Sequence, residues 1–141
     1  MARGQKRTKG SSGYNRKNTE DFLARNRNKP GVIETESGLQ YLQIEAGSDA
    51  FVSPDSIVEV HHRISLLDGT LIEDTYKTGE SVEFVVSEAL EGYREGLVLT
   101  GIGGRSRLFL PPELAWGKRG SGKRIGPYAL LIIDVRLLDI R

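Results

Sequence analysis

The sequence predicts an α+β protein in which about five short antiparallel strands form a half-barrel that wraps around one short helix. Several segments from residue 39 onward alternate apolar and polar residues, which is the period of a half-buried strand. Asp68-Gly69 stands between two apolar runs, a strong signal for a hairpin between antiparallel strands. Among these alternating segments, residues 88–95 instead carry a helical pattern.

The strands follow one another in a readable order. Alternating or strand-like runs cover residues 39–44, 58–64, 82–86, 105–110 and 129–140. In the second run, Val58, Val60 and His62 share one face, while Glu59 and His61 point to the other. Between the third and fourth runs, we expect Ser87 to cap the helix and Gly96 to end it.

The first 29 residues differ from the rest in charge, with nine Lys or Arg against two acidic residues, a net of +7 that leaves −6 on the remainder. We predict that residues 1–17 are a disordered basic tail, because they hold almost nothing apolar. A short helix and linker should occupy residues 18–30, capped by Asn18 or Thr19. Residues 31–141 then form the main domain. Residues 1–29 are either a solubilising segment or an arm that makes weak contacts with RNA or an acidic partner.

Composition narrows the chemistry. There is no cysteine, which excludes disulfides and thiol catalysis. The two histidines, His61 and His62, are adjacent on a strand and point to opposite faces, so we expect no metal site and no cofactor. Residues 117–124 nearly spell a phosphate-binding loop, but Arg124 stands where Ser or Thr must bind magnesium. No apolar run could span a bilayer, and the charged start lacks a secretory pattern, which predicts a cytoplasmic protein with no membrane contact.

From Thr35 to Ile140 the chain resembles the FKBP-type peptidyl-prolyl cis-trans isomerases. The resemblance rests on Ser37-Gly38-Leu39-Gln40-Tyr41, on Asp68-Gly69, on residues 91–97 (EGYREGL) and on residues 110–117 (LPPELAWG), all in the family's order and spacing. It implies an enzyme that assists protein folding, as chaperones do, by rotating X-Pro bonds in proline-containing unfolded or partly folded chains. Such a reaction needs no nucleophile, metal or cofactor, because an apolar pocket disfavours the charge-separated planar amide and so lowers the barrier to twisting it.

The resemblance also assigns the site. It gives catalytic roles to Trp116, Glu73 and Leu90, with Trp116 and the Leu90 amide as donors to the peptide carbonyl. It gives substrate contacts to His62, Ile72, Val82, Ala89, Tyr93 and Ile133. Several of these stand where the family has aromatic residues: Tyr93 replaces a Trp floor, His62 a Tyr, and Ile72, Val82 and Ile133 three Phe walls. Trp116 could alternatively be a core anchor.

Because the predicted pocket has fewer aromatic walls than the family's, the sequence is consistent with two functions. The first is an isomerase of weak to moderate activity. The second is a binding module or chaperone of the same fold that holds proline-containing segments without rotating them. The sequence around Phe22 resembles the family's two-part bacterial members, but we expect their long dimerising helix to be absent, which predicts a monomer.

Overall fold

The structure is a computed structural model that describes residues 11–141; residues 1–10, part of the predicted tail, lie outside the described chain. Its helices are α1 (Ser12–Asn26), α2 (Thr75–Thr78) and α3 (Glu91–Val98). Its strands are β1 (Val32–Glu34), β2 (Gln40–Glu45), β3 (Ile57–Leu66), β4 (Leu71–Asp74), β5 (Val82–Val85), β6 (Arg105–Leu110) and β7 (Leu131–Ile140). Short 3-10 turns cover Val86–Glu88 and Pro112–Leu114.

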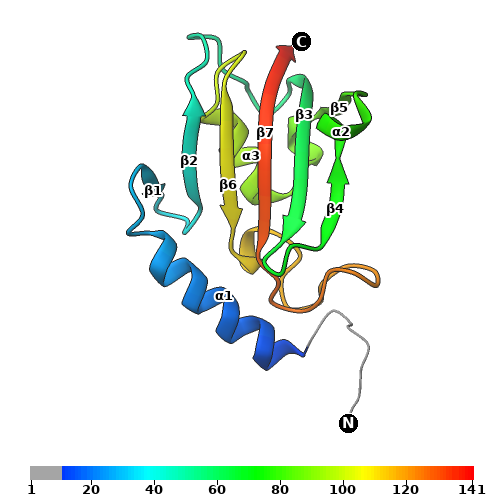
Figure 1. Cartoon of the computed structure of the whole chain (residues 1–141). Helices are drawn as coiled ribbons and strands as arrows, with labels where there is room; N and C mark the ends of the chain where they lie inside the picture. The colour runs from blue at the N-terminus through cyan, green and yellow to red at the C-terminus, as the bar shows by residue number, and fades with distance from the viewer. Residues whose placement is uncertain (1–10) are drawn as a thin grey trace.

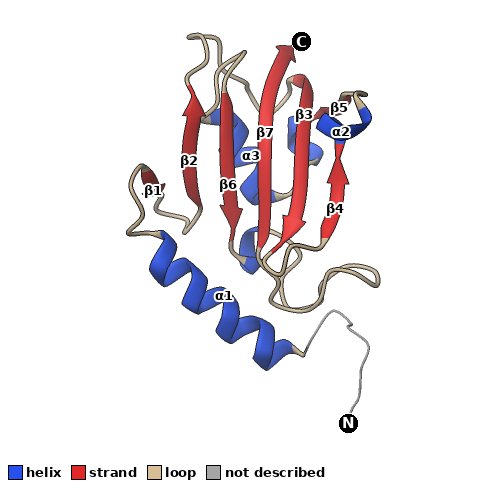
Figure 2. Cartoon of the chain, viewed as in Figure 1, coloured by secondary structure: helices blue, strands red, loops and turns tan. Residues whose placement is uncertain are grey.

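All the strands belong to one antiparallel sheet, in the order β1-β2-β6-β7-β3-β4, with β5 paired to β3. Figure 1 shows α3 behind the sheet and α1 across its lower end, and Figure 2 shows the same arrangement by element type. The predicted α+β class and the curved sheet around one internal helix are confirmed. The sheet has seven strands rather than about five, since short strands such as the three-residue β1 leave little periodic signal.

The core lies between the sheet and α3. On β3, Val58, Val60 and His62 are buried on the face toward α3, as the alternation predicts. The facing strand β7 buries Leu131, Ile133, Val135 and Leu137 on the same side. The hairpin at Asp68-Gly69 joins β3 to β4 as expected, with Gly69 in the left-handed region at φ 92°.

Helix α3 packs its glycine face directly on β6. A Cβ placed on Gly92 would lie 2.5 Å from Leu110 Cγ and 3.1 Å from Leu114 Cβ. Gly96 meets Leu108 in the same way, one turn further along the helix. The absent side chains therefore let the helix backbone approach the sheet.

The predicted limits of this helix were wrong. The predicted cap, Ser87, lies in a 3-10 turn instead, and Leu90 is the N-cap of α3, without a side-chain cap hydrogen bond. Gly96 is buried inside the helix, which continues to Val98. A glycine favours a helix end by its backbone freedom, but here packing against Leu108 selects it for its size.

Helix α1 also begins earlier than predicted. Ser11, not Asn18 or Thr19, is the N-cap, and its hydroxyl accepts a hydrogen bond from the Tyr14 N–H at 3.2 Å. Residues 12–17, predicted to be disordered, are therefore helical. Composition alone missed this because the polar side chains of α1 bond to distant parts of the chain: Asn15 donates to the Pro127 carbonyl at 2.9 Å. No helix within residues 11–141 is long and apolar enough to cross a bilayer.

The outer face of the sheet carries a buried carboxylate. Asp134 accepts two hydrogen bonds from Arg105, at 2.8 and 3.1 Å, and one each from Arg107 and Tyr76. Burial alone would raise the pKa of Asp134, but the hydrogen bonds outweigh it and hold the pKa below its usual 3.8. Burial, with the charge of Asp134 beside it, raises the pKa of Tyr76 to about 12. Arg105 and Arg107 pair the charge of Asp134 on this face.

Candidate active site

The residues predicted to bind a prolyl peptide come from four strands and from the segment leading into α3. Their positions are His62 on β3, Ile72 and Glu73 on β4, Val82 on β5, Ala89 and Leu90 before α3, Tyr93 in α3, and Ile133 on β7. The antiparallel pairing of β3 with β4, β5 and β7 brings these strands together around β3. The loop that carries Trp116 follows the 3-10 turn after β6.

A buried polar pair forms the floor of this region. The Tyr93 hydroxyl lies 2.8 Å from His62 Nδ1, and each residue is 5% exposed. Their rings are tilted with centroids 5.8 Å apart, and the Phe84 ring also packs on Tyr93, with centroids 5.4 Å apart. Burial, the nearby Tyr76 phenol and the Glu73 carboxylate raise the pKa of Tyr93 well above its usual value, so the phenol keeps its proton.

A protonated Tyr93 can donate to His62 Nδ1, which places the imidazole proton on Nε2. That nitrogen lies 3.2 Å from the Glu73 carboxylate, although the two do not meet hydrogen-bond geometry. The result is a line of polar groups from the pocket floor to the edge strand β4, with Glu73 exposed at its outer end.

Two residues that sequence reasoning did not assign to the site support it. Phe84 was recognised as part of a strand, and its i, i+2 spacing from Val82 was the signal that it faces the same side. Thr75 is buried, and its hydroxyl accepts from the His62 N–H at 2.7 Å and lies 3.0 Å from His61 Nδ1. No sequence pattern links Thr75 to the histidines, because the contact depends on the pairing of β3 with β4.

The aliphatic walls divide into two groups. Ile72, Val82, Ala89 and Leu90 are half-buried and pack against the core, so each presents part of its side chain to solvent. Ile133 is fully buried in the core and has no free surface for a peptide in this conformation.

The two groups predicted to donate to the peptide carbonyl, the Leu90 N–H and the Trp116 indole, lie in different environments. As the N-cap of α3, Leu90 uses its carbonyl to accept from the Arg94 N–H at 2.9 Å, whereas its own N–H takes no part in the helix. Trp116 is 41% exposed, which argues against a core anchor and leaves the indole accessible to a ligand. The Gly117 N–H donates to the Pro112 carbonyl at 2.8 Å and so fixes the backbone beside Trp116.

Within residues 11–141, no group of three or more His, Asp or Glu side chains could hold a metal ion. Two surface hollows flank α1. One of about 400 Å³ lies between α1, the β3–β4 hairpin and residues 124–130, and one of about 560 Å³ lies between α1 and the outer face of the sheet.

Residues 48–138 match the family described as FKBP-type peptidyl-prolyl cis-trans isomerase. The chain belongs to this family. Residues 1–42 match a second family, described as the domain amino terminal to FKBP-type peptidyl-prolyl isomerase. The α1 region is therefore similar to a domain that accompanies the isomerase, which the sequence reasoning had treated as a tail, a short helix and a linker.

Named relatives agree with the family. The FKBP-type 22 kDa peptidyl-prolyl cis-trans isomerase of Escherichia coli is 40% identical over 119 residues, which are 84% of this chain and 58% of the relative. The isomerase FkpA of Aeromonas hydrophila is 40% identical over 126 residues, 89% of this chain and 47% of the relative. The chain thus spans about half to three fifths of the length of these FKBP-type relatives.

Solved structures agree on the fold. The crystal structure of FkpA from Escherichia coli superposes with a TM-score of 0.88 at 32% identity, over 92% of this chain and 61% of that one. A peptidyl-prolyl cis-trans isomerase from Pseudomonas syringae gives 0.85 over 93% of this chain and 96% of that one, and at 24% identity it supports the fold alone.

Proposed function

We propose that this protein is a peptidyl-prolyl cis-trans isomerase that rotates X-Pro bonds in unfolded or partly folded chains. The observation that carries the proposal is the floor of the candidate site, where the buried Tyr93 packs on Phe84 and its hydroxyl lies 2.8 Å from His62 Nδ1. Around it stand half-buried aliphatic walls, a setting in which a proline ring can pack. The relatives named as isomerases support the same activity.

The chemistry follows from the environment. A planar amide is stabilised by charge separation, which water favours and an apolar pocket does not. Transfer of the X-Pro bond into the space between Ile72, Val82 and Tyr93 therefore lowers the cost of twisting it. Donors to the peptide carbonyl, from the Trp116 indole and the Leu90 amide, fix the orientation in which the twist occurs.

The test is an NMR exchange or protease-coupled assay on short X-Pro peptides, with two variants of the edge strand β4. Ile72→Lys places a charge in the proposed wall, while Leu71→Lys places it at the neighbouring, exposed position, which points to the other side of the strand. We expect Ile72→Lys to lose at least about ten-fold in kcat/KM and Leu71→Lys to keep wild-type activity. Equal effects of both variants, or no catalysis by the wild type, would exclude the proposal.

A binding module that holds proline-containing segments is the second candidate. The observation that favours it is the aliphatic wall, since Ile72 and Val82 give less ring contact than aromatic side chains would. Measurable affinity for X-Pro peptides without accelerated exchange would select this function.

The predicted monomer, the cytoplasmic location and the RNA or acidic-partner contact of residues 1–29 remain predictions. For the last, part of the basic charge is already paired, because Arg16, Lys17 and Arg27 lie beside Glu20, Asp21 and Glu34. Sedimentation, cell fractionation and titration with RNA oligonucleotides test the three in turn.

A further inference from the structure

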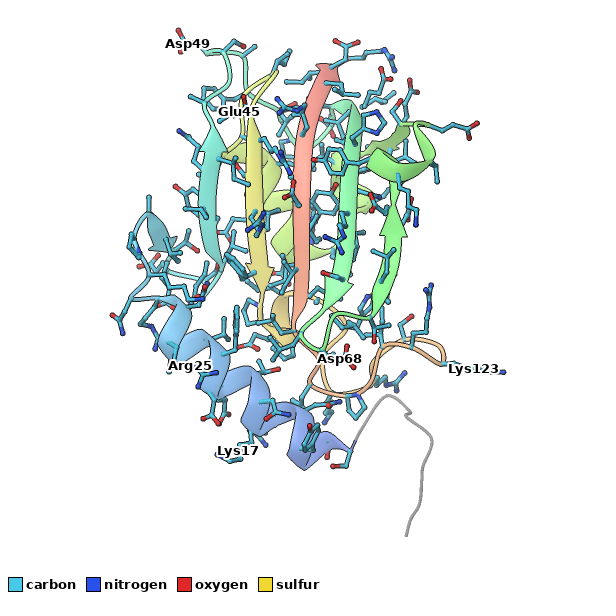
Figure 3. The ribbon with its side chains drawn as sticks, viewed as in Figure 1. Lys17, Arg25, Glu45, Asp49, Asp68 and Lys123 are labelled. Atoms are coloured by element: carbon cyan, nitrogen blue, oxygen red, sulfur yellow. The ribbon has the colours of Figure 1, made fainter. Side chains whose placement is uncertain are left out.

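We propose that α1 is a positioning element for the active-site loop at residues 117–128, and that Thr19 is the positioning residue. This inference rests on the proposed isomerase function, because it concerns the loop next to Trp116. In Figure 3, Lys17 and Arg25 of α1 lie at the same end of the sheet as Lys123 of this loop, while Glu45 and Asp49 lie at the opposite end.

The contact between α1 and the loop is specific. Thr19 is 4% exposed, and its hydroxyl donates to the Tyr128 carbonyl at 3.0 Å. A threonine inside a helix commonly bonds back to a carbonyl of its own preceding turn, whereas Thr19 reaches a residue 109 positions away. Asn15, one turn earlier, donates to the Pro127 carbonyl at 2.9 Å, and the Arg16 guanidinium lies 4.9 Å from the centre of the Tyr128 ring.

From Tyr128 a backbone hydrogen bond continues to Gly117, the neighbour of Trp116. The Tyr128 N–H donates to the Gly117 carbonyl at 2.9 Å, and the Gly117 N–H donates to the Pro112 carbonyl at 2.8 Å. Trp116 directly precedes Gly117 in the chain. Tyr128, whose carbonyl accepts the bond from Thr19, is therefore joined by one further hydrogen bond to Gly117, the residue next to Trp116.

The backbone at Tyr128 explains why an external contact is needed. Its φ is +58°, in the left-handed region that a bulky side chain rarely adopts without support. Both backbone polar groups of Tyr128 are bonded, the carbonyl to Thr19 and the N–H to Gly117. Removal of the bond from Thr19 frees the strained residue to relax, and the loop ends then lose their fixed separation.

The other end of α1 is anchored as well. The Asn26 amide donates to the Gln40 side-chain oxygen at 2.8 Å in a buried contact, and the Gln40 amide donates to the Leu23 carbonyl at 3.0 Å. Phe22 packs on Phe109 of β6 with ring centroids 5.7 Å apart. With its second half fixed to the sheet, α1 can act as a rigid support for the loop.

The experiment compares Thr19→Val with Thr19→Ser. Valine keeps the branched shape without a donor, and serine keeps the donor. Thr100→Val is the matched control, since Thr100 is also buried and its hydroxyl donates to a backbone carbonyl, that of Gly96, at 2.8 Å. The first readout is amide hydrogen exchange at residues 117–128, and the second is kcat and KM on an X-Pro peptide.

We expect Thr19→Val to speed exchange of the Tyr128 amide about five-fold, the effect of one net hydrogen bond, and to lower kcat with little change in KM. Thr19→Ser should restore both values, and Thr100→Val should leave loop exchange unchanged. Asn15→Asp provides a second variant, because a carboxylate in the first turns favours the helix but cannot donate to Pro127, so it should loosen the loop without weakening α1.

The outcomes separate this inference from the function on which it rests. If the wild type shows no isomerase activity, the proposed function fails, while loop exchange still decides whether α1 fixes the loop. Loop exchange that is equal in wild type and Thr19→Val would overturn the inference, and so would failure of serine to restore it. Faster exchange with unchanged kcat would also overturn it, since the contact would then be structural only.

Discussion

Tyr93→Phe should destabilise the protein although it removes a single oxygen atom. That oxygen lies 2.8 Å from His62 Nδ1, and both residues are 5% exposed. The variant leaves a ring nitrogen buried without a partner, which costs about 1–3 kcal/mol of unfolding free energy. For a domain of this size that corresponds to a fall in melting temperature of about 3–10 °C. The ring contact with Phe84 is retained, so the loss measures the hydrogen bond.

A double-mutant cycle with His62→Phe tests this reasoning. Each single variant leaves one buried polar group unpaired, whereas the double variant leaves neither, so the double should be less destabilised than the sum of the singles by about 1 kcal/mol or more. Urea unfolding followed by far-UV circular dichroism gives the three free energies. Additivity within about 0.5 kcal/mol would show that the two side chains do not depend on one another, and would refute the argument.

Three further predictions follow from the geometry. Trp116→Phe should lower kcat/KM about ten-fold through loss of the indole donor, with little change in urea midpoint because Trp116 is 41% exposed; a lowered midpoint with unchanged activity would contradict this. Asp134→Asn should destabilise the protein at pH 7, and the difference from the wild type should shrink as the pH falls below the unfolded value of 3.8, because a pKa depressed in the folded state stabilises the fold above the unfolded pKa and this contribution is lost as pH falls through the folded pKa. Gly92→Ala should cost about 1–3 kcal/mol in urea unfolding by forcing α3 away from Leu110, and a neutral effect would refute the close packing.

The sheet was predictable because its pattern is local. Val58, Val60 and His62 alternate with polar neighbours, and the structure buries all three on one face. Asp68-Gly69 predicted its hairpin because Gly69 can adopt a positive φ, and this local property does not depend on any distant contact. Much of the predicted site came from family resemblance rather than from pattern. The structure places the strand members of that site, His62, Ile72, Glu73, Val82 and Ile133, on β3 and on the strands that pair with it.

The errors share a different cause. Ser87 and Gly96 have the chemistry of helix ends, yet α3 begins only at Glu91, after Ser87, and continues past Gly96 to Val98. Gly96 lies inside the helix because its missing side chain lets the backbone pack on Leu108 of β6, a contact distant in the sequence. Residues 12–17 have the composition of a disordered segment, yet they are helical. Asn15 bonds to Pro127 and Arg16 lies over the ring of Tyr128, and both partners are more than a hundred residues away, so no window of sequence could have contained these interactions.

The pocket floor shows how substitutions that look like losses can form a connected unit. The family's floor residue and one wall residue are replaced here by Tyr93 and His62, and taken singly each change removes aromatic surface. In the structure the Tyr93 hydroxyl and the His62 imidazole are hydrogen-bonded to each other. The Thr75 hydroxyl accepts from the His62 N–H, and the Glu73 carboxylate lies near His62 Nε2. A floor held by a directional bond is more sensitive to the loss of one atom than a floor held by ring contact alone. The isomerase activity should therefore depend on His62 and Tyr93 jointly. A variant with only one of the family's residues, His62→Tyr or Tyr93→Trp, should lose more activity than the double variant that carries both.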